Sequence, residues 1–324
     1  MKFGRLFELR VQVGAGAGQI PTPGPIKSIT DATTIPVRTN LLSMAYPLTL
    51  QFEVSRNVMA SANTGRFTIM NLAESTRLRI ALARHDYLTF KNVQLLAGYD
   101  NGSRLPLIFN GNINAAYSAR QKTDWMTTIE AFDGGADIIN SQVGKTYPQN
   151  LDLRSVIVDV IKTMSNTTLG GVGAFSTPNA SRGRTVSGNS WEQIQKLAGA
   201  KAQTFIDNGR AWVLQGNEYV KVGGPLFIIN AESGLLGAPR WQDAKLALPG
   251  AQQFGARVDV TMIFEPLLQV GQLVQLESED LTFSGQYTVS GITHRGTISG
   301  AVGGECVTVL NLLAASRTLT AVSS

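Results

Sequence analysis

The hydrophobic pattern changes its period twice along this chain, and this change limits the available folds more than any other feature. Near the N-terminus, Phe7–Val13 and Leu48–Val54 alternate apolar and polar residues, as half-buried strands do. From Leu153 to Met164 the apolar residues instead recur three and four positions apart, which places them on one face of a helix. Alternation returns in the segment Arg257–Phe264. We therefore predict a mainly β protein with an α+β insert between two blocks of strands.

The first block is predicted over residues 1–140 as a β-barrel domain. Its strand-like segments are separated by turn signals such as Asp100-Asn101-Gly102 and lie at residues 7–13, 48–54, 65–72, 93–99, 105–118 and 124–135. Several short strands at this spacing are typical of a barrel or a sandwich. Residues 14–47 show no periodicity, so we expect a long arm there that needs a neighbouring surface.

The insert is predicted over residues 150–230 as a small helix-helix-hairpin domain. Its second helix is expected to open at Ser190, because Gln193 completes a capping box. The pair Asn208-Gly209 lies between two apolar runs and predicts a tight hairpin. A second β-barrel domain is expected at residues 240–315, followed by a C-terminal tail at 316–324.

A short echo links the two strand blocks. Phe109-Asn110-Gly111 precedes one predicted strand, and Phe283-Ser284-Gly285 precedes another. We expect both F-x-G segments to occupy equivalent positions in two barrels of one topology. Each phenylalanine would then point into its core, and each glycine would lie at a strand start where a side chain obstructs the bend.

Composition describes a folded protein with few charges. Apolar residues make up 43% of the chain and charged residues 16%. The net charge of +5 comes from residues 1–150, where the basic residues are scattered singly, so a mildly basic surface is favoured over a nucleic-acid site.

The single cysteine, Cys306, lies in a predicted strand and is expected to be a buried thiol. We expect no signal peptide, because Glu8 and Arg10 interrupt the apolar run near the N-terminus. We also expect no membrane-spanning segment, because no run of about 18 apolar residues occurs.

The sequence offers no arrangement of residues typical of an active site. The two histidines, His85 and His294, have no second ligand at metal-binding spacing, and no G-x-S-x-G motif is present. Glycines 14, 16 and 18 lack the spacing of a dinucleotide loop, and the prolines that follow forbid its helix. We therefore predict no catalytic, cofactor-binding or metal-binding residues, and no enzyme activity.

Four segments resemble tail hub proteins of tailed bacteriophages. The segment PLTLQFEVSRNVMASANTGRFTIMNLAESTR resembles the opening barrel of that family, and Asn71, Leu72, Thr76 and Arg77 match its pattern. LLAGYDNG followed by LIFNGNI is similar to its A-G-Y and F-x-G segments. SGLLGAPR resembles the T-G-L-I-G-x-P loop, and EPLLQVGQLVQLES with FSGQYTVSGITHRG resembles the second barrel. The first turn, SANTGR, departs from the family, which often has a P-N pair there.

The resemblance implies a structural virion protein, the baseplate hub that joins a sixfold tail tube to a threefold central spike. It implies a homotrimer of chains with two tail-tube-like barrels each, so that three chains imitate six subunits around a channel for genomic DNA. The implied partners are the tail tube protein, the central spike protein and other baseplate proteins, and the implied location is the virion tail baseplate, assembled in the host cytoplasm.

The loop that contains SGLLGAPR is expected to lead from the insert back to the second barrel. Its structural or interface candidates are Gly234, Leu235, Leu236, Gly237 and Pro239, where the glycines allow tight turns. Three alternatives stay open at this stage: a hub-associated peptidoglycan hydrolase, a tail-tube or distal tail structural protein, and a secreted glycan-binding module.

Overall fold

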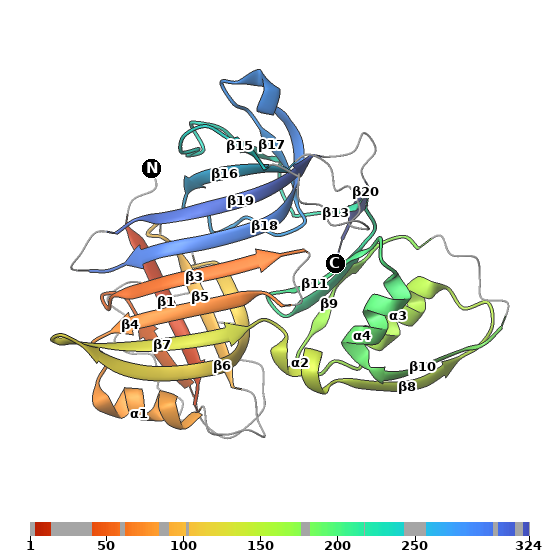
Figure 1. Cartoon of the computed structure of the whole chain (residues 1–324), viewed down its shortest axis with the longest axis horizontal. Coiled ribbons are helices and arrows are strands. Elements are labelled where there is room, and N and C mark those ends of the chain that lie inside the picture. The colour runs from red at the N-terminus through yellow and green to blue at the C-terminus, as the bar shows by residue number, and fades with distance from the viewer. Residues whose placement is uncertain are drawn as a thin grey trace.

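The computed structural model describes residues 4–13, 41–58, 62–83, 91–101, 104–175, 182–216, 218–242, 257–300, 304–314 and 320–323. One large sheet dominates the molecule, and a smaller unit with three of the four helices found in these ranges lies beside it (Figure 1). The helices are α1 (Glu74–Ala83), α2 (Gly135–Asn140), α3 (Leu153–Ile161) and α4 (Ser190–Ala198). None of the helices in the described ranges is long and apolar enough to cross a membrane.

The described residues of the first block form seven strands, and the alternation in the sequence determines which face of the sheet their side chains occupy. The strands are β1 (Arg5–Gln12), β2 (Leu41–Ala45), β3 (Leu50–Asn57), β4 (Thr64–Met70), β5 (Asn92–Tyr99), β6 (Leu107–Gln121) and β7 (Asp124–Phe132). In β3 and β4 the buried and more exposed residues alternate strictly, as the period of two predicts. The expected arm at 14–47 ends earlier than predicted, because β2 pairs with β1 from Leu41 onward. The rest of the arm lies outside the described residues.

In the second block, six strands lie within the described ranges. They are β14 (Phe227–Ile229), β15 (Arg240–Gln242), β16 (Arg257–Ile263), β17 (Leu273–Leu276), β18 (Gly285–Ile298) and β19 (Cys306–Ala314). A 3-10 turn, Leu281–Phe283, precedes β18.

The two predicted barrels are joined in one open sheet, and no closed barrel is found among the described residues. The sheet runs β15-β16-β19-β18-β3-β4-β7-β6-β5-β1-β2, and β17 and β14 branch from β18. The join is made by β18, whose residues Gly291–Ile298 pair antiparallel with β3. Sequence alternation could not foresee this join, because it determines which face a residue occupies and not which strand lies alongside.

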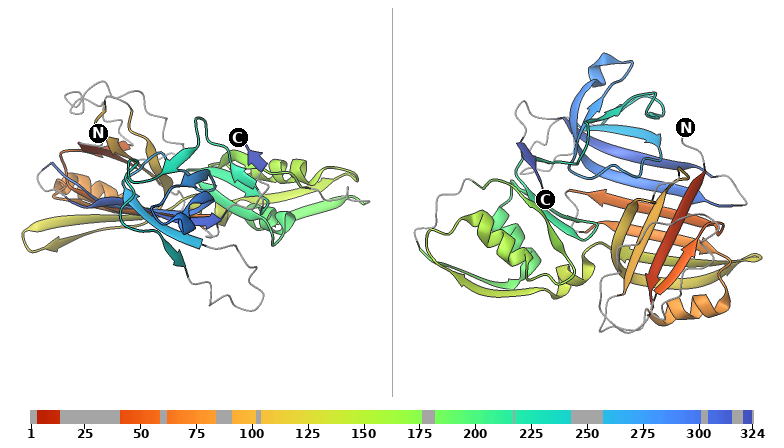
Figure 2. Two further views of the ribbon diagram at one scale, coloured as in Figure 1. Left: turned by 90° about the horizontal axis from the view of Figure 1, so that it is seen from above. Right: turned by 180° about the vertical axis from the view of Figure 1, so that it is seen from behind.

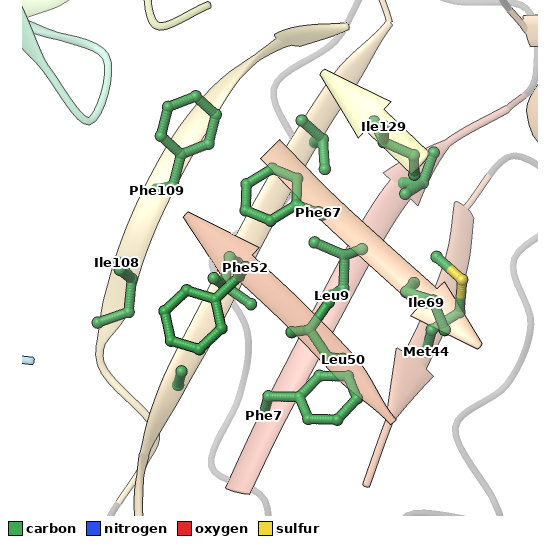
Figure 3. Packing of buried hydrophobic residues seen from close by; sticks show 14 of the residues in the cluster. Phe7, Leu9, Met44, Leu50, Phe52, Phe67, Ile69, Ile108, Phe109 and Ile129 are labelled. Carbon is green, nitrogen blue, oxygen red and sulfur yellow. The ribbon is translucent and has the colours of Figure 1, made fainter. Parts of the chain in front are cut away.

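The first hydrophobic core lies between two layers of strands. Seen from behind, β1 and β5 cross over the sheet that contains β3, β4 and β7 (Figure 2). Figure 3 shows Phe7 and Leu9 of β1 among Leu50, Phe52 and Phe67 of the facing strands. The two longest strands of this block, β6 and β7, extend beyond the core as a hairpin.

The insert has its own core, and its hairpin is shared with the second block. Strands β11 (Gln203–Asp207) and β12 (Arg210–Leu214) pair antiparallel, as Asn208-Gly209 predicted, and both turn residues have positive φ, 52° and 75°. Phe205 and Trp212 face the core of the second block, whereas Ile206 and Val213 face the helices. The hairpin therefore lies between the two cores and contributes side chains to both.

The remaining described strands form small pairings within and beside the insert. They are β8 (Gln142–Tyr147), β9 (Thr168–Val172), β10 (Arg184–Asn189), β13 (Glu218–Val220) and β20 (Thr320–Val322). Strand β8 pairs with β10, β9 with β12, and β13 with β20. The core of the insert includes Val143, so it begins before residue 150, and the expected tail contributes β20, which pairs with β13. The capping prediction was wrong by one residue: Asn189 is the N-cap of α4 and accepts from the Glu192 N–H, whereas Ser190 is buried in the first turn.

The two strand blocks repeat one strand order. The first reads β3-β4-β7-β6-β5-β1 across the sheet, and the second reads β15-β16-β19-β18-β17-β14, with the strands in the same chain order. A bulge interrupts the β6–β7 pairing and another interrupts the β18–β19 pairing. The blocks differ at the end of the series. There β1 pairs antiparallel with β5 and β2 follows it, whereas β14 pairs parallel with β17 and is the last described strand of its block.

Candidate functional site

The join between the strand blocks encloses a buried charged residue, Arg56 of β3. Its guanidinium donates through Nη2 to the Leu268 carbonyl at 2.8 Å and to Nε2 of His294 at 3.0 Å. Through Nη1 it contacts both carboxylate oxygens of Asp207 at 3.4 Å. One side chain of the first block thus contacts the second block and the insert at once. Removing one partner of such a buried pair leaves an uncompensated charge, which costs about 3–5 kcal/mol.

His294 of β18 is a neutral part of this junction. Since Arg56 can only donate, Nε2 of His294 accepts, and the proton on Nδ1 is donated to Thr308 Oγ1 at 2.9 Å. Burial and the nearby Arg56 charge hold the pKa of His294 well below its ordinary value of 6.5. His294 therefore acts as a fixed acceptor for Arg56. The other histidine, His85, lies outside the described residues.

Asp133 anchors the turn of the insert hairpin to the first block. It lies in the turn after β7, and its carboxylate accepts from the backbone N–H groups of Asn208 and Gly209, the latter at 2.9 Å. Burial and the neighbouring Asp207 raise the pKa of Asp133 from 3.8 to about 8. Arg56, Asp133 and Asp207 border a cleft of about 520 Å³ between the two strand blocks and the insert. Within the described ranges, no cluster of three or more metal-ligating side chains exists.

A second candidate surface is the polar face of the joined sheet. Glu53, Arg66 and Glu130 are directly opposite one another on β3, β4 and β7, and Arg295 of β18 is opposite Glu53. The charges alternate along this row, and Arg66 Nε lies 3.6 Å from Glu130 Oε1. Glu53, Arg66 and Arg295 border a shallow hollow of about 730 Å³. Exposed pairs of this kind contribute only about 0–1 kcal/mol, so their main effect is a face with little net charge.

The SGLLGAPR loop packs against the edge of the second block. Ser233 and Asn230 exchange hydrogen bonds, and Gly234 follows with a φ of 107°. A Cβ on Gly234 would lie 1.9 Å from Cγ1 of Ile263, so both the backbone angle and the space require glycine. Leu235 packs against the second core.

The later part of the loop is more exposed. Leu236 is 44% exposed, and Gly237, with a φ of 70°, has open space where a Cβ would lie. Pro239 is buried directly before β15. Gly234 and Leu235 are therefore packed against the second block, whereas Leu236 and Gly237 lie at the surface. A role for any of these residues in an interface remains a proposal.

The F-x-G segments do not occupy the equivalent positions that we expected. When the two bulges are aligned, Phe109 of β6 corresponds to Gly285 of β18, and Gly111 corresponds to Tyr287. The offset is two residues, and Phe283 lies in the 3-10 turn before β18 rather than in the strand. Phe109 is fully buried against Phe67, with ring centroids 5.5 Å apart, whereas Phe283 lies at the margin of the second core.

The two glycines of these segments also differ. A Cβ on Gly111 would lie 2.6 Å from the Phe132 carbonyl oxygen, so the strand requires glycine there. A Cβ on Gly285 would make only an ordinary contact, at 3.7 Å from Tyr287. Gly111 lies inside β6 rather than at its start, and only Gly285 opens a strand.

Sequence reasoning missed the buried junction, although one signal was present. Arg56 falls in phase with Leu50, Phe52 and Val54, on the apolar face of an alternating strand. A charged residue at such a position must find partners in the core. Its main partner, Asp207, lies 151 residues away, and no local pattern identifies it.

The comparisons identify the family to which this architecture belongs. Residues 32–295 match the family model described as Baseplate hub gp41. The chain belongs to this baseplate hub family. The resemblance to phage tail hubs is thereby confirmed, and the chain is a baseplate hub or tail structural protein of a phage. A search of curated protein sequences found no match.

Solved structures share the fold at low sequence identity. The tail protein from Neisseria meningitidis MC58 has a TM-score of 0.57 and 9% identity, with 96% of this chain and 97% of that chain covered. The 43 kDa tail protein of prophage MuSo2 from Shewanella oneidensis has a TM-score of 0.54 and 11% identity, with 84% and 94% covered. The Francisella PdpA-VgrG complex has a TM-score of 0.58 and 10% identity, with 98% of this chain and 54% of that chain covered.

Proposed function

We propose that this chain forms a homotrimeric baseplate hub that connects a sixfold tail tube to a threefold central spike. The observation that carries the proposal is the repeated strand order, which gives one chain two similar units. Three such chains related by a threefold axis present six similar units on one face. A tube of sixfold symmetry can bind those units, while a spike of threefold symmetry can bind the features that occur once per chain, such as the insert.

The polar face of the joined sheet is proposed to line the channel for genomic DNA. A channel must let DNA pass without holding it, and phosphate contacts with basic side chains add up to strong binding. Along the row of Arg295, Glu53, Arg66 and Glu130 each basic residue has an acidic neighbour. This alternation prevents a continuous basic stripe, and it supports the channel role for this face.

The hub role predicts defined partners and a location. We propose that the trimer contacts the tail tube protein, the central spike protein and other baseplate proteins in the virion tail, after assembly in the host cytoplasm. We also propose that the chain has no enzymatic activity. The hydrogen-bond partners of the two buried acidic side chains support this, because Asp207 contacts Arg56 and Asp133 accepts two backbone N–H groups.

A reconstitution experiment tests the proposed role and separates it from the alternatives. The purified chain is mixed with the tail tube protein and the spike protein encoded by the same phage, and complexes are analysed by size exclusion and mass measurement. The hub proposal predicts one complex that contains all three proteins. A chain that polymerises alone and ignores the spike protein would indicate a tail-tube protein, and clearing of a peptidoglycan suspension would indicate the hydrolase.

A further inference from the structure

The cleft between the two strand blocks and the insert, which we call the junction cleft, is rich in amide side chains. On the side of the first block, Asn92 and Gln94 of β5 lie opposite Asn112 and Asn110 of β6, and all four border the cleft. Gln94 Nε2 donates to Asn110 Oδ1 at 3.3 Å, and Asn112 Nδ2 donates to Asn92 Oδ1 at 2.6 Å. Asn208, in the turn of the insert hairpin, borders the same cleft. Its volume of about 520 Å³ falls in the range of small-ligand pockets.

Three buried polar atoms of residues that line the junction cleft have no hydrogen-bond partner among the described residues. They are Nε of Arg56, Oε1 of Gln94 and Oδ1 of Asn208. Arg56 is 2% exposed and Gln94 is 8% exposed, so bulk solvent does not satisfy these two side chains. Buried polar groups in native proteins are normally paired, and an unpaired one calls for an explanation. The three atoms, one donor and two acceptors, come from the first block and the insert.

The junction cleft carries little net charge. Arg56 contacts Asp207 at 3.4 Å, so these two charges are paired. The pKa of Asp133 is raised to about 8, so this carboxyl group is largely protonated at pH 7. Arg210, which is exposed, is the remaining charged residue among the described residues that line the cleft. An uncharged ligand that forms hydrogen bonds therefore suits this cleft better than a phosphate group or a metal ion.

Aliphatic side chains border the cleft beside these amides. Leu107 and Leu267 are exposed there, the latter at 67%, and each follows a proline that also lines the cleft. Trp212, the aromatic residue among the described lining residues, is only 6% exposed and packs in the core of the second block. Sugar rings commonly stack on exposed aromatic faces. The border therefore favours a ligand with aliphatic groups over a glycan.

We propose that the junction cleft binds a short, extended and uncharged segment of a partner polypeptide. Backbone N–H groups of that segment donate to Gln94 Oε1 and Asn208 Oδ1, and one of its backbone carbonyls accepts from Arg56 Nε. Its apolar side chains contact Leu107 and Leu267. A peptide group suits the site because it carries one donor and one acceptor, as the amide side chains of the cleft do.

Such a segment would touch both strand blocks and the insert, because the lining residues come from all three. A ligand that binds only this folded arrangement stabilises it by mass action. The inference goes beyond the proposed hub role, since it concerns a site within one chain and does not depend on the trimer.

Selection from a peptide library tests the site. A randomised library of short, uncharged peptides is selected against the purified chain, and the dissociation constants of the selected peptides are measured by fluorescence anisotropy. Gln94→Met keeps the length of the side chain and removes its amide. Leu267→Ala shortens an exposed side chain and should leave the fold intact. The proposal predicts that each variant raises the dissociation constant at least about tenfold, because the bound peptide loses a hydrogen-bond acceptor or an apolar contact.

Gln286→Met and Leu281→Ala are the matched controls. Both residues are exposed, and neither is among the described residues that line the junction cleft. These variants should bind the selected peptides with unchanged dissociation constants. A library that yields no binding peptide, or peptides that bind the two cleft variants as tightly as the unchanged chain, would overturn the proposal. Binding of a chito-oligosaccharide that Leu267→Ala weakens would also overturn it, and would assign the cleft to a glycan. All three outcomes leave the hub role intact, because reconstitution with the tube and spike proteins tests that role separately.

Discussion

Gly234 provides a prediction whose magnitude follows from the geometry of the SGLLGAPR loop. At a φ of 107° an alanine bears a backbone strain of about 1–3 kcal/mol. Its Cβ would also meet Cγ1 of Ile263 at 1.9 Å, and overpacking of this kind costs about 1–3 kcal/mol. The alanine also reduces the flexibility of the unfolded chain, which favours the folded state by about 0.4–1 kcal/mol. Gly234→Ala should therefore lower the free energy of unfolding by about 3 kcal/mol.

Gly237 is the matched control in the same loop. Its φ of 70° is also left-handed, but its Cβ would meet open space, so Gly237→Ala should cost only about 1 kcal/mol. Urea unfolding followed by far-UV circular dichroism measures both variants. Ile263→Ala removes the side chain that the new Cβ would meet. The double variant should therefore lose less free energy of unfolding than the sum of the two single losses, with a coupling energy of about 1–3 kcal/mol. Equal losses for the two glycine variants, or no coupling with Ile263, would refute the packing argument.

Three further predictions concern the strand blocks and the junction. Gly111→Ala should lower the free energy of unfolding by about 1–3 kcal/mol, whereas Gly285→Ala should leave it within about 1 kcal/mol, as urea midpoints will report. Phe109→Ala should cost about 3–5 kcal/mol by the same assay, because the ring is fully buried. Folding raises the pKa of Asp133 from 3.8 to about 8, so the folded state keeps a proton that the unfolded state releases, and the free energy of unfolding should fall between pH 4 and pH 8. Asp133→Asn should flatten that decline, and an unchanged pH profile of the free energy of unfolding would count against the raised pKa of Asp133.

The sequence predicted those parts of the fold that depend on local pattern. Alternation located β3 and β4, the apolar stripe located α3, and Asn208-Gly209 located the hairpin of the insert. Each of these signals is contained within a few residues, because backbone geometry and one buried face determine it.

The sequence could not predict how distant segments meet. The pairing of β18 with β3 joins Arg295 to Glu53, and the junction joins Arg56 to Asp207; both contacts span more than 150 residues. The repeat was predicted in outline from the two F-x-G segments, but their register was wrong by two residues. A short motif cannot reveal a bulge, and the bulges determine the register here.

Electron microscopy of the purified assembly tests the central proposal most directly. The account predicts a particle with a mass three times the 34.7 kDa of one chain, seen end-on as a ring of six similar lobes with threefold symmetry around an open channel. The polar face with Glu53 and Arg66 should line that channel. A stable monomer at micromolar concentration, or a ring in which this face points outward, would contradict the account.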